Sequence, residues 1–370
     1  MANILKSSIL CSQGNLEQTL NAIKTNNIMI ASQNIATLDG DILSPYFLLQ
    51  EKIQEDKTEV YEAIKNIVSD LVSSLNSSQR ADTALLIGTS QIDLNIVDAI
   101  VDTLYDAKEY HSRKKSIDTY AQDISNELGL NGYTMTLSTA CTSSANGVLQ
   151  ANELINCGAF EYVVVIGLEI FSKMMSDGFS SMGLLSQNLQ RPFDERRDSL
   201  VLGEAIAGVL IGVDDSPWSV EGGYSNCNSN TITAAGEAGD EFYEVITSAL
   251  ETLGLDAKEI TAIKAHATAS VSNDLSEINA ISRAFDKDVI FTALKPYVGH
   301  TLGACGVLEL ALFMKSIDEG FIPKTINTHK SIMADYAPIY EDVACKEGTF
   351  MLNYFGFGGN NVSMIIKKKS

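Results

Sequence analysis

The chain has 370 residues, of which 45% are hydrophobic, enough to bury one large core or two closely joined cores, so a disordered protein is excluded. Its 26 basic and 47 acidic residues give a formal net charge of −21, which disfavours nucleic acid or an anionic membrane surface as the main partner. The sequence contains no run near the roughly 20 apolar residues that span a bilayer. We therefore predict a cytoplasmic protein with no membrane span. The six cysteines form no Cys-x-x-Cys pair, so neither a disulfide framework nor a metal site is predicted.

Apolar spacing predicts alternating helices and strands in the first half of the chain. Gly158 is a suitable left-handed cap for the second of these helices. Three consecutive valines begin at Val163 and indicate a central strand that is buried on both faces, as in parallel sheets covered by helices. The elements expected here are helices at 60–75 and 145–158 and strands at 84–87, 162–166 and 209–212.

The second half has a comparable order of elements. Its expected elements are helices at 242–253, 274–285 and 303–318 and strands at 260–264, 289–292, 349–354 and 362–366. Asp274 is a suitable N-cap for the middle helix. Strands that alternate with helices in two similar halves predict an α/β protein of packed layers, divided into residues 1–215 and 216–370.

Cys141 is a candidate nucleophile because it lies among small residues just ahead of the helix predicted at 145–158. Backbone N–H groups and the dipole at a helix N-terminus favour the thiolate, which is the reactive form of cysteine. A lone cysteine in such a turn is more often a small buried side chain without a chemical role. Further residues are needed to decide between these interpretations.

Two of the four histidines lie in unusual settings. His266 follows a predicted strand, and His300 lies in a loop between a strand and a helix. Either residue alone is also compatible with a structural, hydrogen-bonded histidine. His111 and His329 lie in polar segments, and we interpret both as structural.

The sequence resembles a decarboxylating β-ketoacyl synthase of the thiolase fold, of the type with a Cys-His-His active site. The similar segments occur in one order along much of the chain. They are Thr139-Ala140-Cys141-Thr142-Ser143, Arg191-Pro192-Phe193-Asp194, Val201-Leu202-Gly203-Glu204, His266-x-Thr268 with Asp274 and Glu277, Lys295 with His300, Gly303-Ala304 with Glu309, and residues 353–360.

The resemblance implies a thiolase-like, five-layered αβαβα fold made of two similar halves, the first with the nucleophile and the second with both histidines. Cys141 would take the growing acyl group from a phosphopantetheine thioester, and malonyl on an acyl carrier protein would then lose CO₂ and extend it. His266 and His300 would stabilise the developing enolate. Lys295 and Glu309 would support these histidines through a buried charged network.

The resemblance also assigns the remaining site. Phe357 would gate the nucleophile, and its backbone N–H would form an oxyanion hole with that of Cys141. The residues implied in binding the pantetheine arm are Thr268, Ser270, Gly356 and Gly358. Arg197 is the candidate for carrier docking. No cofactor is expected beyond the phosphopantetheine that the acyl carrier protein supplies.

The sequence departs from the family pattern in two places. The usual His-Gly-Thr-Gly-Thr run is His266-Ala267-Thr268-Ala269-Ser270, and Asn360 replaces a threonine near the C-terminus. Neither change removes a reacting group. The chain is also shorter than typical elongating synthases, so the length of the acyl pocket cannot be predicted.

A serine hydrolase lacks support because no Gly-x-Ser-x-Gly motif occurs. A nucleotide-binding protein lacks support because the glycine-rich segment at 356–360 lies between strands, whereas a phosphate-binding loop opens a helix. An accessory, chain-length-type subunit would lack Cys141, and an initiating synthase would carry asparagine in place of His300. We therefore expect an elongating synthase, either a homodimer or the catalytic half of a heterodimer with a second synthase-like chain.

Overall fold

The computed structural model describes residues 2–35, 40–49, 57–91, 116–228 and 236–369. Ten strands form one sheet: β1 Ala2–Cys11, β4 Thr83–Thr89, β5 Thr134–Leu137, β6 Tyr162–Glu169, β7 Ala205–Gly212, β8 Trp218–Cys227, β9 Ile260–Lys264, β10 Phe291–Thr292, β13 Gly348–Phe355 and β14 Asn360–Lys368. Their order is β10-β9-β13-β14-β8-β1-β7-β6-β4-β5. Two small antiparallel sheets pair β2 Ala31–Ile35 with β3 Ile42–Tyr46 and β11 Phe321–Ile322 with β12 Val343–Ala344.

The large sheet repeats one pattern of strand directions. In one half, β6 and β4 are parallel, β4 and β5 are parallel, and β7 runs antiparallel to both β6 and β1. In the other half, β13, β9 and β10 are parallel, and β14 runs antiparallel to both β13 and β8. β6 is buried along its whole length as predicted, and its similarity to a strand of a parallel sheet holds for its β4 neighbour but not for β7. The halves join where Ala2 pairs with Val220 and Asn3 with Ser219.

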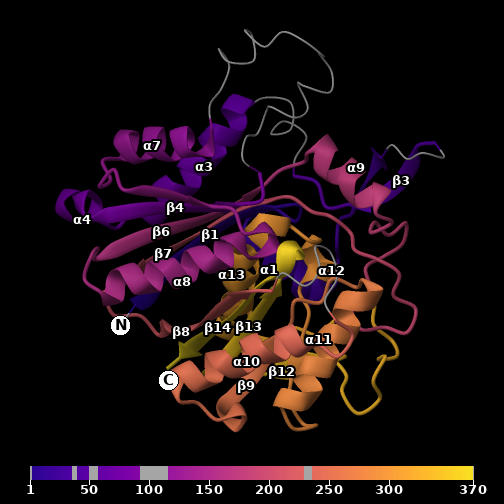
Figure 1. Cartoon of the computed structure of the whole chain (residues 1–370). Coiled ribbons are helices and arrows are strands. Elements are labelled where there is room, and N and C mark those ends of the chain that lie inside the picture. The colour runs from indigo at the N-terminus through magenta and orange to yellow at the C-terminus, as the bar shows by residue number, and fades with distance from the viewer. Residues whose placement is uncertain (1, 36–39, 50–56, 92–115, 229–235, 370) are drawn as a thin grey trace.

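Helices separate and cover the two halves of the sheet, which gives five layers (Figure 1). The middle layer contains α1 Leu16–Thr25, α8 Ser143–Asn156 and α13 Cys305–Asp318. The outer layer over the first half contains α3 Lys57–Leu71, α4 Ser77–Ala81 and α7 Ile117–Leu128. The outer layer over the second half contains α10 Asp240–Leu253 and α11 Val271–Ala284. Of two shorter helices, α9 Lys173–Ser181 lies beside the small β2–β3 sheet and α12 Lys295–Val298 lies near the centre of the view (Figure 1).

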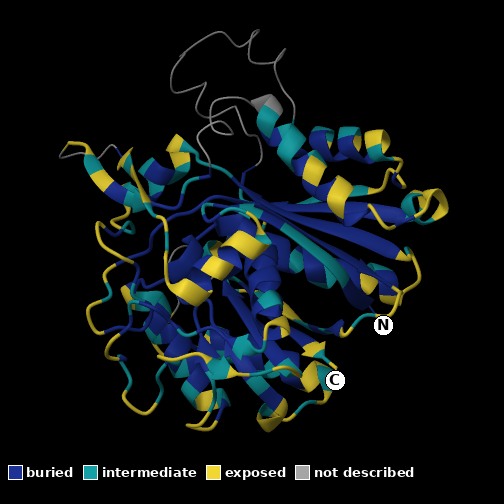
Figure 2. Cartoon of the chain, turned by 180° about the vertical axis from the view of Figure 1, so that it is seen from behind, coloured by how far each residue is buried: buried dark blue, intermediate teal, exposed yellow. Residues whose placement is uncertain are grey.

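Three apolar clusters match these layers. The largest lies between the sheet halves around α8 and α13, and the other two lie beneath the outer helices. Figure 2 shows the buried strands and middle helices inside and the exposed positions on outer helices and loops. Burial on almost every side explains why α13 is apolar along nearly its whole length. The five-layered α/β arrangement agrees with the predicted fold class.

Most predicted elements are present, with ends that differ by a few residues. One cap is wrong, because α11 begins at Val271 and has Ser270, instead of Asp274, at its N-cap position. The predicted helix at 60–75 starts earlier, at Lys57, and ends at Leu71. Within the described ranges, no helix combines the length and apolar character needed to cross a bilayer.

Candidate active site

Cys141 lies in a short 3₁₀ helix, Ala140–Thr142, that connects β5 to α8. The residue before it, Ala140, has a φ of +53°, a left-handed conformation that is strained for a residue with a side chain. The Cys305 thiol donates to the carbonyl of Cys141 at 3.1 Å, and Ser144 Oγ donates to the carbonyl of Gly303 at 2.6 Å. These bonds tie the nucleophile turn to the start of α13.

The thiol of Cys141 is buried, and burial raises its pKa to about 11. The Lys295 charge and the backbone N–H groups of Phe357 and Cys141 act in the opposite direction and offset only part of this effect. Desolvation therefore opposes the effect of the helix terminus, which favours the thiolate. The same two N–H groups are the pair predicted to form the oxyanion hole.

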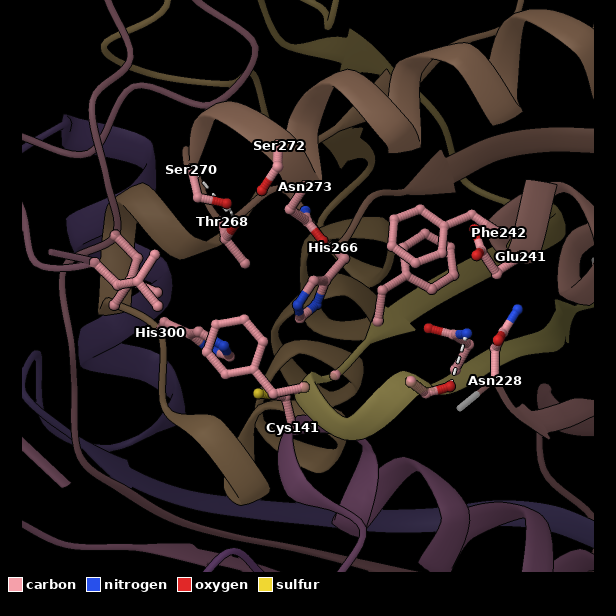
Figure 3. A pocket seen from close by; sticks show the side chains of 17 residues that line it. Cys141, Asn228, Glu241, Phe242, His266, Thr268, Ser270, Ser272, Asn273 and His300 are labelled. Atoms are coloured by element: carbon pink, nitrogen blue, oxygen red, sulfur yellow. Dashed lines mark hydrogen bonds between the residues drawn. The ribbon is translucent and has the colours of Figure 1, made fainter. Parts of the chain in front are cut away.

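His266 and His300 are both buried and lie close to each other, with ring centroids 5.3 Å apart at 84°. His266 follows β9, and its backbone N–H donates to Glu277 Oε1 at 2.6 Å. His300 follows α12, and its backbone N–H donates to the carbonyl of Val201 at 2.7 Å. Figure 3 shows both rings beside Cys141 in the same cavity.

The tautomer of His266 follows from its neighbour. The ammonium group of Lys295 lies 3.3 Å from His266 Nδ1, and an ammonium group can only donate. The ring proton is therefore on Nε2. In the described part of the chain, no group forms a hydrogen bond with His266 Nε2 or with His300 Nδ1, although both atoms are buried. Among the described residues, these two ring nitrogens therefore keep unused hydrogen-bonding capacity.

Both imidazoles are held in the neutral form. Burial lowers the pKa of His266 and of His300 well below the usual value, and the positive charge of Lys295 lowers both further. A neutral imidazole donates one hydrogen bond without bringing a buried charge. The pair is thus suited to stabilise a developing negative charge.

A buried network of charges lies behind the histidines. Glu309 on α13 accepts from Lys295 Nζ at Oε1 and from Lys264 Nζ at Oε2, both at 2.6 Å. All three side chains are almost fully excluded from solvent. The Lys295–Glu309 pair was predicted, whereas Lys264 was missed, because a lysine that ends a strand normally extends into solvent.

The two hydroxyls predicted to hold the pantetheine arm lie side by side, since Thr268 Oγ1 and Ser270 Oγ are 3.0 Å apart. Ala267, which precedes Thr268, has a φ of +55°, and Ala269, between Thr268 and Ser270, has a φ of +66°. Carboxylates fix this turn: Glu277 Oε2 accepts from the N–H of Ala267, and Asp274 accepts from that of Ala269. Asp274 therefore holds the turn instead of capping α11.

Phe357 lies in the turn between β13 and β14, where its ring stacks on Phe179 with centroids 5.5 Å apart. The backbone at Gly356 passes close to the nucleophile, because a Cβ there would lie 3.2 Å from the Cys141 nitrogen. Gly358 has a φ of +77°. The left-handed backbone at Gly358 thus favours glycine, whereas at Gly356 a side chain would meet a tight contact with the nucleophile turn.

Two cavities share Cys141 and Phe357. One is mixed in character and is lined by the histidines and by polar side chains, among them Asn228, Thr268, Ser270, Ser272 and Asn273. The other is apolar and is lined by Met174, Met175, Phe179, Met182 and Leu302. The thiol therefore lies between a cavity of mixed character and an apolar recess.

Arg197 lies apart from these reacting groups. Its guanidinium donates to the carbonyls of Val271 at 2.7 Å and Asp194 at 3.3 Å, so much of it is engaged within the fold. The backbone N–H of His329 donates to Asp194 Oδ2. His111 lies outside the described residues.

Comparisons with known proteins cover both halves of the chain. Residues 58–214 match the family model of the β-ketoacyl synthase N-terminal domain, and residues 219–329 match that of the C-terminal domain. A chloroplastic 3-oxoacyl-[acyl-carrier-protein] synthase I from Arabidopsis thaliana is 32% identical over 255 residues. The aligned part is 64% of this chain but only 54% of that protein, so the chain spans about half the length of this relative.

A second relative and a solved structure extend the match. The 3-oxoacyl-[acyl-carrier-protein] synthase 1 of Buchnera aphidicola is 30% identical over 305 residues, which are 76% of this chain and 73% of that protein. A ketosynthase (ApeO) from Xenorhabdus doucetiae, solved in complex with its chain length factor (ApeC), has a TM-score of 0.83 and 22% identity, and covers 100% of this chain and 98% of its own. Its likeness shows the fold. Because two family models and a relative aligned over most of its length agree, the chain belongs to the β-ketoacyl synthase family.

Proposed function

We propose that the protein is an elongating β-ketoacyl synthase, which extends an acyl chain by decarboxylative Claisen condensation with malonyl on an acyl carrier protein. The observation that carries this proposal is the cavity in which one buried thiol faces two neutral imidazoles. The names of the relatives, which are 3-oxoacyl-[acyl-carrier-protein] synthases, support the same reaction. The proposed product is the β-ketoacyl chain of a fatty acid, polyketide or polyene pathway.

In the first half-reaction, Cys141 Sγ attacks the thioester carbonyl of the acyl group on phosphopantetheine. A new C–S bond forms at Cys141, the C–S bond to pantetheine breaks, and the thiol proton passes to the departing pantetheine sulfur. The N–H groups of Cys141 and Phe357 hold the oxyanion that forms in between. Because the free thiol has a raised pKa, it loses its proton during the attack instead of beforehand.

In the second half-reaction, the histidines bind the thioester oxygen of malonyl. The C–C bond to the carboxylate breaks, CO₂ leaves, and the electron pair forms an enolate whose negative oxygen accepts from His266 Nε2–H and from His300. The enolate carbon attacks the acyl carbonyl on Cys141. The new C–C bond expels the cysteine sulfur, which takes up a proton and returns to the thiol.

The two cavities suit the two parts of the substrate. We assign the mixed one to the phosphopantetheine arm, where the hydroxyls of Thr268 and Ser270 and the backbone at Gly356 can contact its amides. Gly358, which was also expected at the arm, lines the apolar recess instead. We assign the apolar recess to the acyl chain, because burial of hydrocarbon against apolar side chains is favourable. Phosphopantetheine then belongs to the substrate and is supplied by the carrier protein.

The partners follow from this assignment. We propose the acyl carrier protein as the substrate-bearing partner, with Arg197 near the docking region. For assembly we propose a homodimer, or a heterodimer in which this chain is the catalytic half. The structural neighbour that is paired with a chain length factor supports the second arrangement. A purely accessory role is disfavoured by Cys141 and by both histidines.

Two further assignments remain proposals. We propose residues 1–215 and 216–370 as the two halves of the enzyme, supported by the repeated strand pattern and by the loop between Gly212 and Trp218. We propose a cytoplasmic location, supported by six free cysteines, two of them exposed, which suit a reducing compartment. Tagged protein followed by cell fractionation checks the location.

The reaction is tested with Cys141→Ala. This variant cannot form the acyl-enzyme, so transfer from an acyl-loaded carrier protein is lost, while decarboxylation of malonyl-carrier protein continues because both histidines remain. Cys157→Ala is the matched control, since Cys157 is exposed and lines neither cavity. Acylation that persists in Cys141→Ala at another residue contradicts the proposal.

A further inference from the structure

Lys264 is a buried cation that the reaction described above does not use. It ends β9, and its side chain is fully excluded from solvent. Its ammonium group donates to Glu309 Oε2 at 2.6 Å and to the carbonyl of Asn353 at 2.8 Å. It also lies 3.6 Å from the centroid of the Tyr354 ring, within the range of a cation–π interaction. These contacts make a built site for one positive charge.

The charges of this cluster do not cancel. Glu309 supplies one negative charge and is shared by two ammonium groups, those of Lys264 and Lys295. Lys264, Lys295 and Glu309 together therefore carry one net positive charge while both lysines are protonated, and the buried Glu277 carboxyl lies outside this count. The titratable groups that interact with Lys264 are Glu309 and Cys305 on α13, Lys295 on α12, Glu277 on α11, and His266 and His300 at the cavity.

Resting on the proposed function, we propose that Lys264 is a positioning residue for malonyl decarboxylation. Its charge disfavours protonation of both imidazoles, so that they bind the thioester oxygen as neutral donors. Its bond to Glu309 Oε2 fixes the plane of that carboxylate, which directs Lys295 toward His266 Nδ1. Lys264 thus acts through Glu309 and Lys295 and does not contact the substrate.

Geometry and charge support both parts of this role. A carboxylate held at each oxygen by a separate ammonium group cannot rotate without losing one short hydrogen bond. A positive charge in a poorly solvated interior acts over a longer range than one at the surface. Lys264 accordingly lowers the pKa of His266 and that of His300, although burial and Lys295 have larger effects.

The test is the pH profile of malonyl-carrier decarboxylation. Lys264→Met removes the charge and the hydrogen bonds, whereas Lys264→Gln removes the charge and retains a donor for Glu309. In both variants we expect the acid limb of kcat to move to higher pH by about one unit. At pH values below the acid limbs of wild type and variant, this shift means a loss of about tenfold in kcat, whereas kcat near pH 8 should change little. Lys258→Met, at an exposed lysine, is the control and keeps the wild-type profile.

The possible outcomes are distinct. A uniform loss of kcat at every pH, or an unchanged acid limb in both folded variants, overturns the proposal for Lys264. Wild-type protein that neither acylates Cys141 nor decarboxylates malonyl overturns the proposed function instead.

A measurement on the wild-type protein covers the case in which neither variant folds. Burial lowers the pKa of Lys264 to about 8. In protein with ¹³C-labelled lysine and ¹⁵N-labelled histidine, a lysine signal that titrates near that pH should be accompanied by a shift of the His266 ring nitrogens. Histidine signals that do not shift as the lysine titrates would contradict the proposed coupling between Lys264 and His266.

Discussion

The ammonium group of Lys295 lies 3.3 Å from Nδ1 of His266 and thereby places the ring proton on Nε2. This single contact connects the buried charges to the cavity. Lys295 in turn depends on Glu309, which also binds Lys264. Glu309, which contacts Lys295 and not His266, therefore helps to set the orientation of the His266 Nε2–H donor.

The shared carboxylate predicts unequal effects on stability. Glu309→Gln leaves two buried ammonium groups without an anion and should lower the free energy of unfolding by about 3–5 kcal/mol. Lys295→Met leaves Lys264 paired with Glu309 and should cost clearly less. Urea denaturation of both variants measures the difference. Equal losses would show that Lys264 does not share the carboxylate.

The lowered pKa values of the histidines predict the acid limit of activity. Activity requires neutral imidazoles, so it is present above the folded-state pKa and lost as the pH falls through it. Because burial moves the pKa of His266 and of His300 well below the usual value of about 6.5, decarboxylation should persist at pH 6. Measuring kcat between pH 4.5 and 8, in steps of about half a pH unit, checks this prediction. A half-maximal rate near pH 6.5 is the contrary result.

The left-handed alanines predict a stabilising substitution. Ala269 has a φ of +66°, and residues with a Cβ pay about 1–2 kcal/mol in this region, whereas glycine does not. Ala269→Gly should therefore raise the free energy of unfolding by about 1 kcal/mol, since glycine's larger unfolded-state entropy offsets part of the gain. Ala280→Gly, at a buried position inside α11, is the control and should destabilise. A loss of stability in Ala269→Gly would contradict the strained turn.

The position of Arg197 predicts a separation of kinetic constants. If Arg197 contacts the carrier protein, Arg197→Glu raises the apparent KM for that protein and leaves kcat nearly unchanged. Arg196→Glu is the matched control, because Arg196 is the adjacent and more exposed arginine. If kcat falls with no change in KM, the hydrogen bonds of Arg197 to Val271 and Asp194 are its main role.

The sequence allowed the layers and most of their elements to be predicted, because buried strands such as β6 and capped helices such as α10 carry local signals. The direction of β7 could not be predicted, since pairing depends on partners that are distant in the chain. The cap of α11 was misassigned for a related reason: Asp274 accepts from the N–H of Ala269 in the turn before α11 and from that of Phe193 in a distant segment. Local propensity contains no information about that turn.

The site residues were brought together largely as expected, since motifs far apart in the sequence converge on one cavity. Two features required the structure. The pKa of Cys141 depends on its burial, which a position ahead of a helix does not reveal. Lys264 has no motif of its own, and its role is visible only through the second oxygen of Glu309.

The central claim is that Cys141 carries the acyl group, and whole-protein mass spectrometry tests it most directly. The protein is incubated with a panel of acyl-loaded carrier proteins, and the added mass is then located by peptide mapping. The account predicts that one acyl mass is added, at Cys141, and that it is released when malonyl-carrier protein is supplied. An acyl group found on any other residue, or an unmodified Cys141 with every loaded carrier, would contradict it.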